Sequence, residues 1–112
     1  MKVVFSSIGA DWESLVDPRL GRAKGFVVYD DGKDELSYIA NDEAANASQG
    51  AGLQMAKLML DLHADVIITG NGPGEKASDV LNKSKVKIYV GAGDMSLRDA
   101  YKAYQEQKLT QL

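Results

Sequence analysis

Two short apolar runs in this chain each lead directly into a glycine-rich loop and then into a helical pattern. The first run, 64–69, precedes Gly70-Asn71-Gly72-Pro73-Gly74, and the second run, 85–90, precedes Gly91-Ala92-Gly93-Asp94. β-branched residues favour strands, glycines permit a sharp exit, and proline suits a first helical turn. This pattern is typical of a parallel α/β sheet, in which ligands usually bind where the strands end.

Hydrophobic periodicity predicts the remaining elements. Strands are expected at 1–8, 26–29, 36–39, 66–69 and 86–90, and helices at 49–63, at 73–83 and from Ser96 onward, with a polar connector over 41–48. In the first predicted helix, Leu53, Ala56 and Leu60 keep helical spacing. The apolar stripe is widened by Met55, Leu58, Met59 and Leu62, so we expect this helix to be covered on much of its circumference. Together these elements predict an α/β fold whose mixed five-stranded sheet has the order 3-2-1-4-5, with strand 2 antiparallel and helices on the faces.

Composition narrows the class of protein. The 112 residues are expected to form a single domain, 1–112, with a net charge of −3 and mixed signs, so nucleic-acid binding is not expected. The chain has no Cys and one His, which excludes disulfides and cysteine-ligated clusters. Without a membrane-length apolar stretch or a signal-peptide pattern, no membrane association is expected and the expected compartment is the cytoplasm.

The glycine loops form the first candidate site. In the predicted order the first, fourth and fifth strands are parallel, so their loops leave the sheet at one edge and could offer backbone N–H donors to an anion. A tight strand-to-helix turn is the alternative explanation for such loops. The candidate ligand-binding residues are Ser7, Gly9, Trp12, Arg19, Gly21, Arg22, Gly70, Asn71, Gly72, Gly91 and Gly93.

Four further side chains each allow two interpretations. Arg19 and Arg22 could clamp an anionic ligand, or they could be solvated or paired with neighbours such as Asp17. Trp12 could cap a ligand or a partner contact, or it could fold back onto the core. His63 falls at a predicted helix end, where a structural role is favoured over metal ligation, and no metal ligands are assigned.

Several motifs, in order along nearly the whole chain, resemble the dinitrogenase iron-molybdenum cofactor biosynthesis family. They are Ser7-Ile8-Gly9, the run 16–23, the run 26–30, Gly50-Ala51-Gly52, the run 64–70 and the closing Ala100, Tyr104 and Leu109. The resemblance implies a ribonuclease-H-like fold and a carrier that binds an iron–sulfur or iron–molybdenum cluster precursor. Carrier members tend to have His in the first loop, with Cys or His nearby, whereas this loop reads Arg19-Leu20-Gly21-Arg22.

The leading functional hypothesis is therefore a small noncatalytic binding protein that holds an anionic ligand, such as a metal-cluster precursor, at the strand-exit edge. Backbone donors of the glycine loops and the charges of Arg19 and Arg22 would hold it. The resemblance further implies a protein partner in cluster transfer, and we expect a monomer or weak dimer. An enzyme acting on nucleotides or phosphoesters, or a protein-interaction module, remains the alternative.

Overall fold

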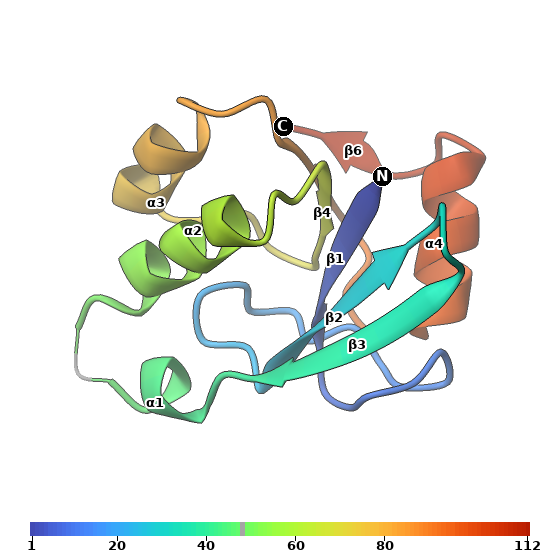
Figure 1. Ribbon diagram of the computed structural model, residues 1–112, viewed down its shortest axis with the longest axis horizontal. Coiled ribbons are helices and arrows are strands. Elements are labelled where there is room, and N and C mark those ends of the chain that lie inside the picture. Colours follow the sequence, from blue (N-terminus) through green and yellow to red (C-terminus); the bar gives the residue numbers. More distant parts are fainter. Residues whose placement is uncertain (48) are drawn as a thin grey trace.

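A mixed six-stranded sheet runs through the centre of the molecule in the order β3-β2-β1-β4-β5-β6 (Figure 1). The computed structural model describes residues 1–47 and 49–112. The strands are β1 (Lys2–Ser7), β2 (Gly25–Asp30), β3 (Glu35–Ala40), β4 (Val66–Ile68), β5 (Lys87–Val90) and β6 (Thr110–Gln111). β1 pairs in parallel with β4, and β4 with β5, while β2 is antiparallel to both β1 and β3. The predicted order 3-2-1-4-5 is confirmed.

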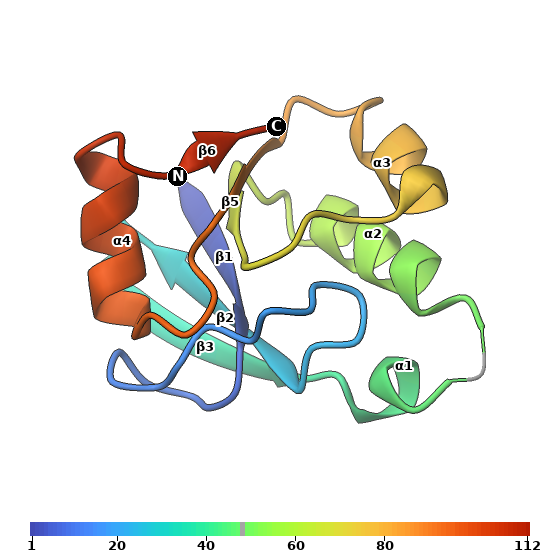
Figure 2. The same ribbon diagram turned by 180° about the vertical axis from the view of Figure 1, so that it is seen from behind.

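Helices cover both faces of the sheet. They are α1 (Asp42–Ala45), α2 (Ala51–Asp61), α3 (Glu75–Leu81) and α4 (Leu97–Gln105). The two ribbon views show α2 and α3 together on one face and α4 alone on the other (Figures 1 and 2). No helix in the described part of the chain is long and apolar enough to span a membrane.

Strand alternation divides the core into two layers. Val4, Phe26 and Ile67 pack towards α2 and α3, whereas Val3, Phe5 and Ile68 pack towards α4. Successive side chains of a strand point to opposite faces, so a six-residue strand such as β1 supplies both layers. The central strands β1, β2 and β4 are therefore buried on both faces, as their continuous apolar runs predict, whereas the edge strands β3 and β6 are largely exposed.

The structure differs from the predicted elements at three places. β6 was not predicted, and it adds an antiparallel edge strand through the pairs Tyr89–Gln111 and Val90–Thr110. Part of the predicted connector forms α1, while Ser48 of that connector lies outside the described residues. The predicted face of α2 is partly wrong, because Leu53 is 44% exposed and Leu60 36% exposed.

The helix start at Ser96 is confirmed by its capping geometry. The Ser96 side chain accepts a hydrogen bond from the Asp99 backbone N–H at 3.1 Å, which satisfies one of the unpaired donors in the first turn of α4. Leu97 and Ala100 are fully buried in this helix, and Tyr101 and Tyr104 pack against the same core layer. α4 is thus fixed at its beginning and along one face.

Candidate functional site

The loops that follow β4 and β5 meet the segment around Pro18 at one end of the sheet. The Asn71 N–H donates to the Pro18 carbonyl at 2.8 Å, and the Gly91 N–H donates to the Gly70 carbonyl at 3.1 Å. A Cβ atom at Gly70 would stand 2.6 Å from Pro18 Cα and 3.1 Å from Gly93 Cα. The predicted convergence of these loops is therefore present, and two of their amides already serve contacts inside the fold.

Ser7 and Gly9 form a local turn at the end of β1. The Ser7 hydroxyl donates to the Gly9 carbonyl, and the Gly9 N–H donates to Ser7 Oγ at 3.2 Å. Ser7 is fully buried. Both residues thus help to shape the start of the loop that leads to Arg19.

Residues 17–24, called here the Arg loop, close around the carboxylate of Asp17. The backbone N–H groups of Arg19 and Lys24 donate to its two oxygens, each at 3.0 Å, and the Arg19 Nε donates at 3.3 Å. Asp17 is 1% exposed. Burial raises the pKa of this carboxyl, but the hydrogen bonds from Arg19 and Lys24 outweigh burial and hold the pKa below its usual value.

The second arginine of the loop holds a neighbouring segment. Arg22 Nη1 donates to the Ala45 carbonyl at 3.2 Å and to the Ala47 carbonyl at 2.6 Å. Arg19 is instead the more exposed partner of its ion pair, with 59% of its side chain accessible. Both arginines therefore have protein partners, and Arg22 also contributes to local structure.

A cavity lies between the Arg loop, the beginning of α2 and the beginning of α3. It consists of two adjoining hollows, of about 400 Å³ and about 610 Å³, which share Gly50, Gly52 and Gly74 in their walls. We call it the α2–α3 cavity. Of the candidate residues from the sequence, it brings together Arg19, Gly21, Arg22, Asn71 and Gly72.

The first turn of α2 forms the wall of this cavity. A Cβ atom at Gly21 would lie 3.1 Å from Gly52 Cα, so the Arg loop sits directly on that turn. The N-cap residue, Gly50, has φ of 84° and gives no side-chain cap, and the turn contains no acidic residue. The positive end of the helix dipole is thus left without a carboxylate from the helix itself.

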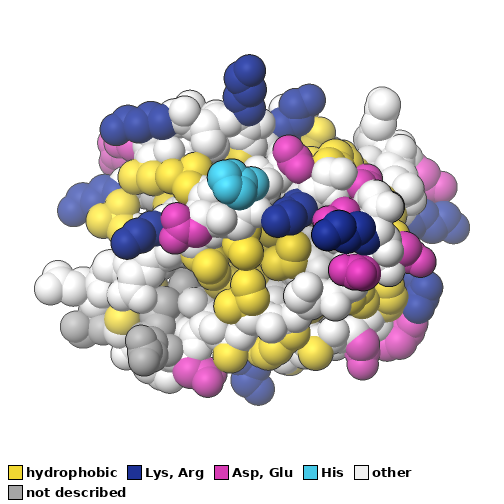
Figure 3. Space-filling model, in the orientation of Figure 1, with side chains coloured by type: hydrophobic (Ala, Val, Ile, Leu, Met, Phe, Trp, Pro, Cys, Tyr) yellow, Lys and Arg dark blue, Asp and Glu magenta, His cyan; other side chains and the backbone are white. Residues whose placement is uncertain are grey.

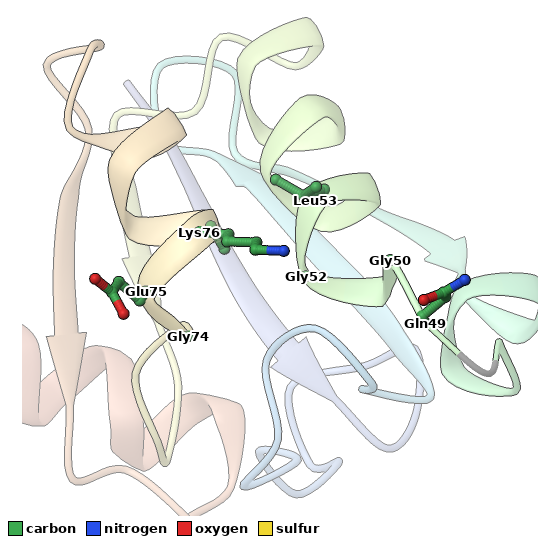
Figure 4. Close-up of a pocket in the computed structure, with 8 residues that line it drawn as sticks. Gln49, Gly50, Gly52, Leu53, Gly74, Glu75 and Lys76 are labelled. Carbon is green, nitrogen blue, oxygen red and sulfur yellow. The ribbon is translucent and has the colours of Figure 1, made fainter.

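Lys76 adds a cation that the sequence analysis did not identify. In Figure 4 its side chain extends from α3 towards the first turn of α2, while Glu75 points away from the space between the helices. Gly74 belongs to the glycine loop that the sequence offers as a candidate site. Gly50 and Gly52 were not among the candidates, although the Gly50-Ala51-Gly52 run at the start of a predicted helix was a usable signal. In contrast to the basic side chains that line the cavity, acidic and basic side chains are interspersed on the face of the molecule that Figure 3 shows.

The structure places Trp12 away from the α2–α3 cavity, on the α4 side of the sheet. Its ring packs edge-on against Phe5 and Tyr29, with centroids 6.0 and 4.9 Å apart, and lies 5.7 Å from the Tyr101 ring. Trp12 is part of the core layer beneath α4. The alternative that this aromatic side chain folds back onto the core describes the observed packing.

Gly91, Gly93 and His63 are also separated from the cavity. Gly91 and Gly93 belong to the loop after β5, and Gly93 packs against Gly70 and Pro18. His63 is exposed after the far end of α2, with φ of 55°. Within residues 1–47 and 49–112, no group of three His, Cys, Asp or Glu side chains could hold a metal ion.

Comparisons with known proteins agree with this fold. The orange protein from Desulfovibrio gigas, solved in its apo form, is 29% identical, with a TM-score of 0.91 over 99% of this chain and 92% of that one. A putative NifB protein from Thermotoga, described as a DUF35 family member, is 27% identical, with a TM-score of 0.82 over the same shares. No curated protein sequence matches. Residues 1–107 match the family described as dinitrogenase iron-molybdenum cofactor, and the chain belongs to that family.

Proposed function

We propose that this protein is a noncatalytic binding protein that holds an anionic metal-cluster precursor in the α2–α3 cavity. The observation that carries the proposal is that Arg19 and Arg22 line one hollow of this cavity and Lys76 lines the adjoining one, both at the positive end of α2. Three cations and a helix N-terminus favour an anion there. Membership of the dinitrogenase iron-molybdenum cofactor family makes a metal–sulfur anion the fitting cargo.

The side chains around the cavity suit a preassembled anion better than a bare metal ion. The chain has no Cys, and its single His follows the C-terminal end of α2. Soft metals prefer thiolate or imidazole ligands, which this cavity does not offer. Guanidinium, ammonium and backbone N–H groups can instead donate hydrogen bonds to the sulfur or oxygen atoms at the surface of a cluster.

The state of Asp17 supports binding over catalysis. A general acid or base works best with a pKa near the operating pH, whereas hydrogen bonds hold the pKa of Asp17 below its usual value. Its carboxylate is also buried behind the Arg19 guanidinium and occupied by four donated hydrogen bonds. This arrangement favours the binding hypothesis over the phosphoester or nucleotide enzyme.

The proposed cargo would be received and passed on by contact with a protein partner. Arg19 is 59% exposed, and Asn71, Gly72 and Gly74 are exposed at the same cavity. A cluster held there would stay accessible from outside the protein. Direct transfer needs such access, since a fully enclosed cargo could leave only after the protein opened.

Anaerobic titration with tetrathiomolybdate, a simple molybdenum sulfide anion, tests the proposal. We expect saturable binding by the wild type, seen as a change in the visible absorption spectrum, and Arg19→Ala should weaken it by about 10- to 100-fold through loss of a charge-assisted hydrogen bond. Arg98→Ala is the matched control, because Arg98 also pairs with a carboxylate but belongs to α4 on the opposite face. His63→Ala should bind like the wild type.

Three results would contradict the proposal. If Arg19→Ala and Arg98→Ala both bind as the wild type does, the ligand does not occupy the α2–α3 cavity. If only His63→Ala loses binding, a metal-ligand role for that residue replaces the charge-based one. Turnover of a nucleotide or phosphoester that is abolished by Arg19→Ala would favour the enzyme hypothesis.

A further inference from the structure

The two ends of the Asp17–Arg19 ion pair differ sharply in exposure. The carboxylate side is 1% exposed and the guanidinium side 59% exposed. Besides the two backbone donors, Asp17 accepts hydrogen bonds from Arg19 Nε at 3.3 Å and from Arg19 Nη2 at 3.4 Å. The Asp17 carboxylate is thus buried and fixed in place, and its hydrogen bonds orient the exposed guanidinium of Arg19.

The atoms that make these contacts define how the guanidinium can act. Nε and Nη2 form one edge of the planar group, and together they face Asp17. A guanidinium has five N–H donors in a rigid fork, so an arginine held along this edge still presents the donors of its other edge. Since Arg19 also lines the α2–α3 cavity, those remaining donors are the ones available to a ligand.

We propose that Asp17 is a positioning residue, which holds Arg19 along one edge of its guanidinium so that the other edge can bind the anion. The inference rests on the proposed function and adds a residue that does not itself touch the cargo. Ordering a free arginine side chain on binding costs conformational entropy, and Asp17 removes part of this cost before the ligand arrives.

The backbone contacts of Asp17 explain why its carboxylate can hold the Arg19 guanidinium in place. Its own N–H donates to the Ser6 carbonyl at 2.8 Å, and its carbonyl accepts from the Ser6 hydroxyl at 2.7 Å. The next residue, Pro18, is fixed by the Asn71 amide. These hydrogen bonds fix Asp17 relative to β1 and to the loop after β4. Because the Arg19 guanidinium donates to the Asp17 carboxylate, it also has a defined position at the end of the sheet.

The Arg98–Glu13 pair is a counterpart in which the carboxylate is exposed, and its guanidinium carbon lies 6.0 Å from the centre of the Trp12 ring. Arg98 also uses Nε and Nη2, at 2.9 and 2.7 Å, but its partner Glu13 is 72% exposed. Exposed ion pairs contribute little to stability, because solvent screens the two charges and holding both side chains in one geometry costs entropy. Arg98 therefore gives a matched control for any substitution at Arg19.

The first experiment measures the order of Arg19 in the protein without ligand. We expect the Arg19 Nε–H in NMR spectra to be more ordered, and slower to exchange with water, than the Arg98 Nε–H. Asp17→Asn should bring Arg19 to the level of Arg98, because a neutral amide is a weaker acceptor for the guanidinium. Equal order of Arg19 in the wild type and in folded Asp17→Asn would overturn the inference.

The second experiment uses Arg19→Lys, which leaves Asp17 intact and answers the question even where Asp17→Asn fails to fold. Lysine keeps the positive charge, but its single ammonium group lacks the two donor edges of a guanidinium. It can therefore donate to Asp17 or to the anion, but not to both in the geometry that arginine allows. We expect Arg19→Lys to weaken tetrathiomolybdate binding about tenfold, and Arg98→Lys to leave it unchanged. In the Arg19→Lys background, Asp17→Asn should weaken binding less than it does in the wild type.

The outcomes separate the two proposals. If the wild type does not bind tetrathiomolybdate, the proposed function fails and the positioning role fails with it. If the wild type binds and Arg19→Lys binds equally well, the binding function stands and the positioning role is wrong. If Asp17→Asn lowers the affinity by the same factor in the wild type and in the Arg19→Lys variant, Asp17 acts only by shaping the Arg loop.

Discussion

At the residue scale, the buried carboxylate of Asp17 connects the stability of the protein to pH. Its pKa is lower in the folded protein than the 3.8 of an unperturbed carboxyl, so the folded state favours the ionised form. The stabilisation is fully present above pH 3.8 and is lost as the pH falls through the lower folded value. Asp17 thus contributes to the acid limb of the stability curve and not to any change near neutral pH.

We expect Asp17→Asn to lower the free energy of unfolding at pH 7 by about 1–3 kcal/mol, because the amide leaves a buried donor without its acceptor. The difference from the wild type should begin to shrink below pH 3.8, where the carboxyl of the unfolded chain binds a proton, and should be smallest once the pH falls below the lower pKa of the folded protein. Urea unfolding between pH 2 and pH 7 measures both effects. A constant difference across that range would show that ionisation of Asp17 does not stabilise the fold.

The glycines of the strand-exit loops differ in what a side chain would meet. At Gly70 a Cβ atom would lie 2.6 Å from Pro18 Cα, whereas at Gly74 it would have no neighbour within 4 Å. Gly70→Ala should therefore destabilise the protein by about 1–3 kcal/mol through overpacking. Gly74→Ala is the matched control and should change stability by less than about 1 kcal/mol. Thermal unfolding that ranks the two variants in the reverse order would contradict this packing.

At the element scale, α2 shows where periodicity succeeds and where it fails. The helix was predicted, and Met55, Ala56 and Met59 of its predicted apolar stripe are buried, but Leu53 and Leu60 of the same stripe are exposed. Apolar residues occur around so much of the helix that spacing alone does not select the covered face. The contact with the sheet and with α3 decides the face, and this contact is not encoded within the helix.

The neighbouring residues Met59 and Leu60 provide a matched test of that face. Met59 is 1% exposed and Leu60 36% exposed. Met59→Ala should cost about 2–5 kcal/mol because it opens a cavity in the core, whereas Leu60→Ala should cost less than about 1 kcal/mol. Urea denaturation of both variants measures the difference. Equal losses of stability would mean that α2 packs with a different face towards the sheet.

β6 illustrates a different reason for a missed element. Thr110–Gln111 is two residues long, and strand periodicity needs a longer run to be detected. Its pairing depends on β5 offering an edge beside it. The order of the other five strands could be predicted because apolar runs, turn residues and crossover handedness constrain it together.

At the scale of the whole molecule, the sheet divides the predicted candidate residues between two faces. The Arg loop reaches the α2–α3 cavity, whereas Trp12 packs beneath α4. Both belong to the same long connection between β1 and β2, so their closeness in sequence suggested one site. The chain passes from one layer to the other between Val16, which packs in the α4 layer, and Leu20, which packs in the α2–α3 layer, and this crossing is a property of the tertiary fold.

The overall charge also bears on how an anion would bind. The chain carries a net charge of −3, so an approaching anion meets repulsion at long range and attraction only near the cations of the cavity. Salt screens both effects over a Debye length of about 8–10 Å. The affinity should therefore depend on the local arrangement of Arg19, Arg22 and Lys76 more than on the total charge.

Ligand binding should in turn stabilise the folded protein as a whole. A ligand that binds only the folded state adds about 2.7 kcal/mol of stability at a concentration 100 times its Kd. For a chain of 112 residues this corresponds to a rise in Tm of roughly 10 °C or more. Thermal melts with increasing tetrathiomolybdate should show this rise for the wild type and for Arg98→Ala, and a much smaller one for Arg19→Ala.

The same melts distinguish binding from folding for the two arginines. Arg19→Ala removes two of the four hydrogen bonds to the buried Asp17 carboxylate, so its Tm without ligand should fall moderately, and its binding is judged from the further rise that the ligand adds. Arg22→Ala loses the hydrogen bonds to the Ala45 and Ala47 carbonyls, and we expect it to lower the Tm even without ligand. If Arg22→Ala leaves that Tm unchanged while removing the ligand-dependent rise, Arg22 acts on the anion directly and its contacts to the segment after α1 contribute little to stability.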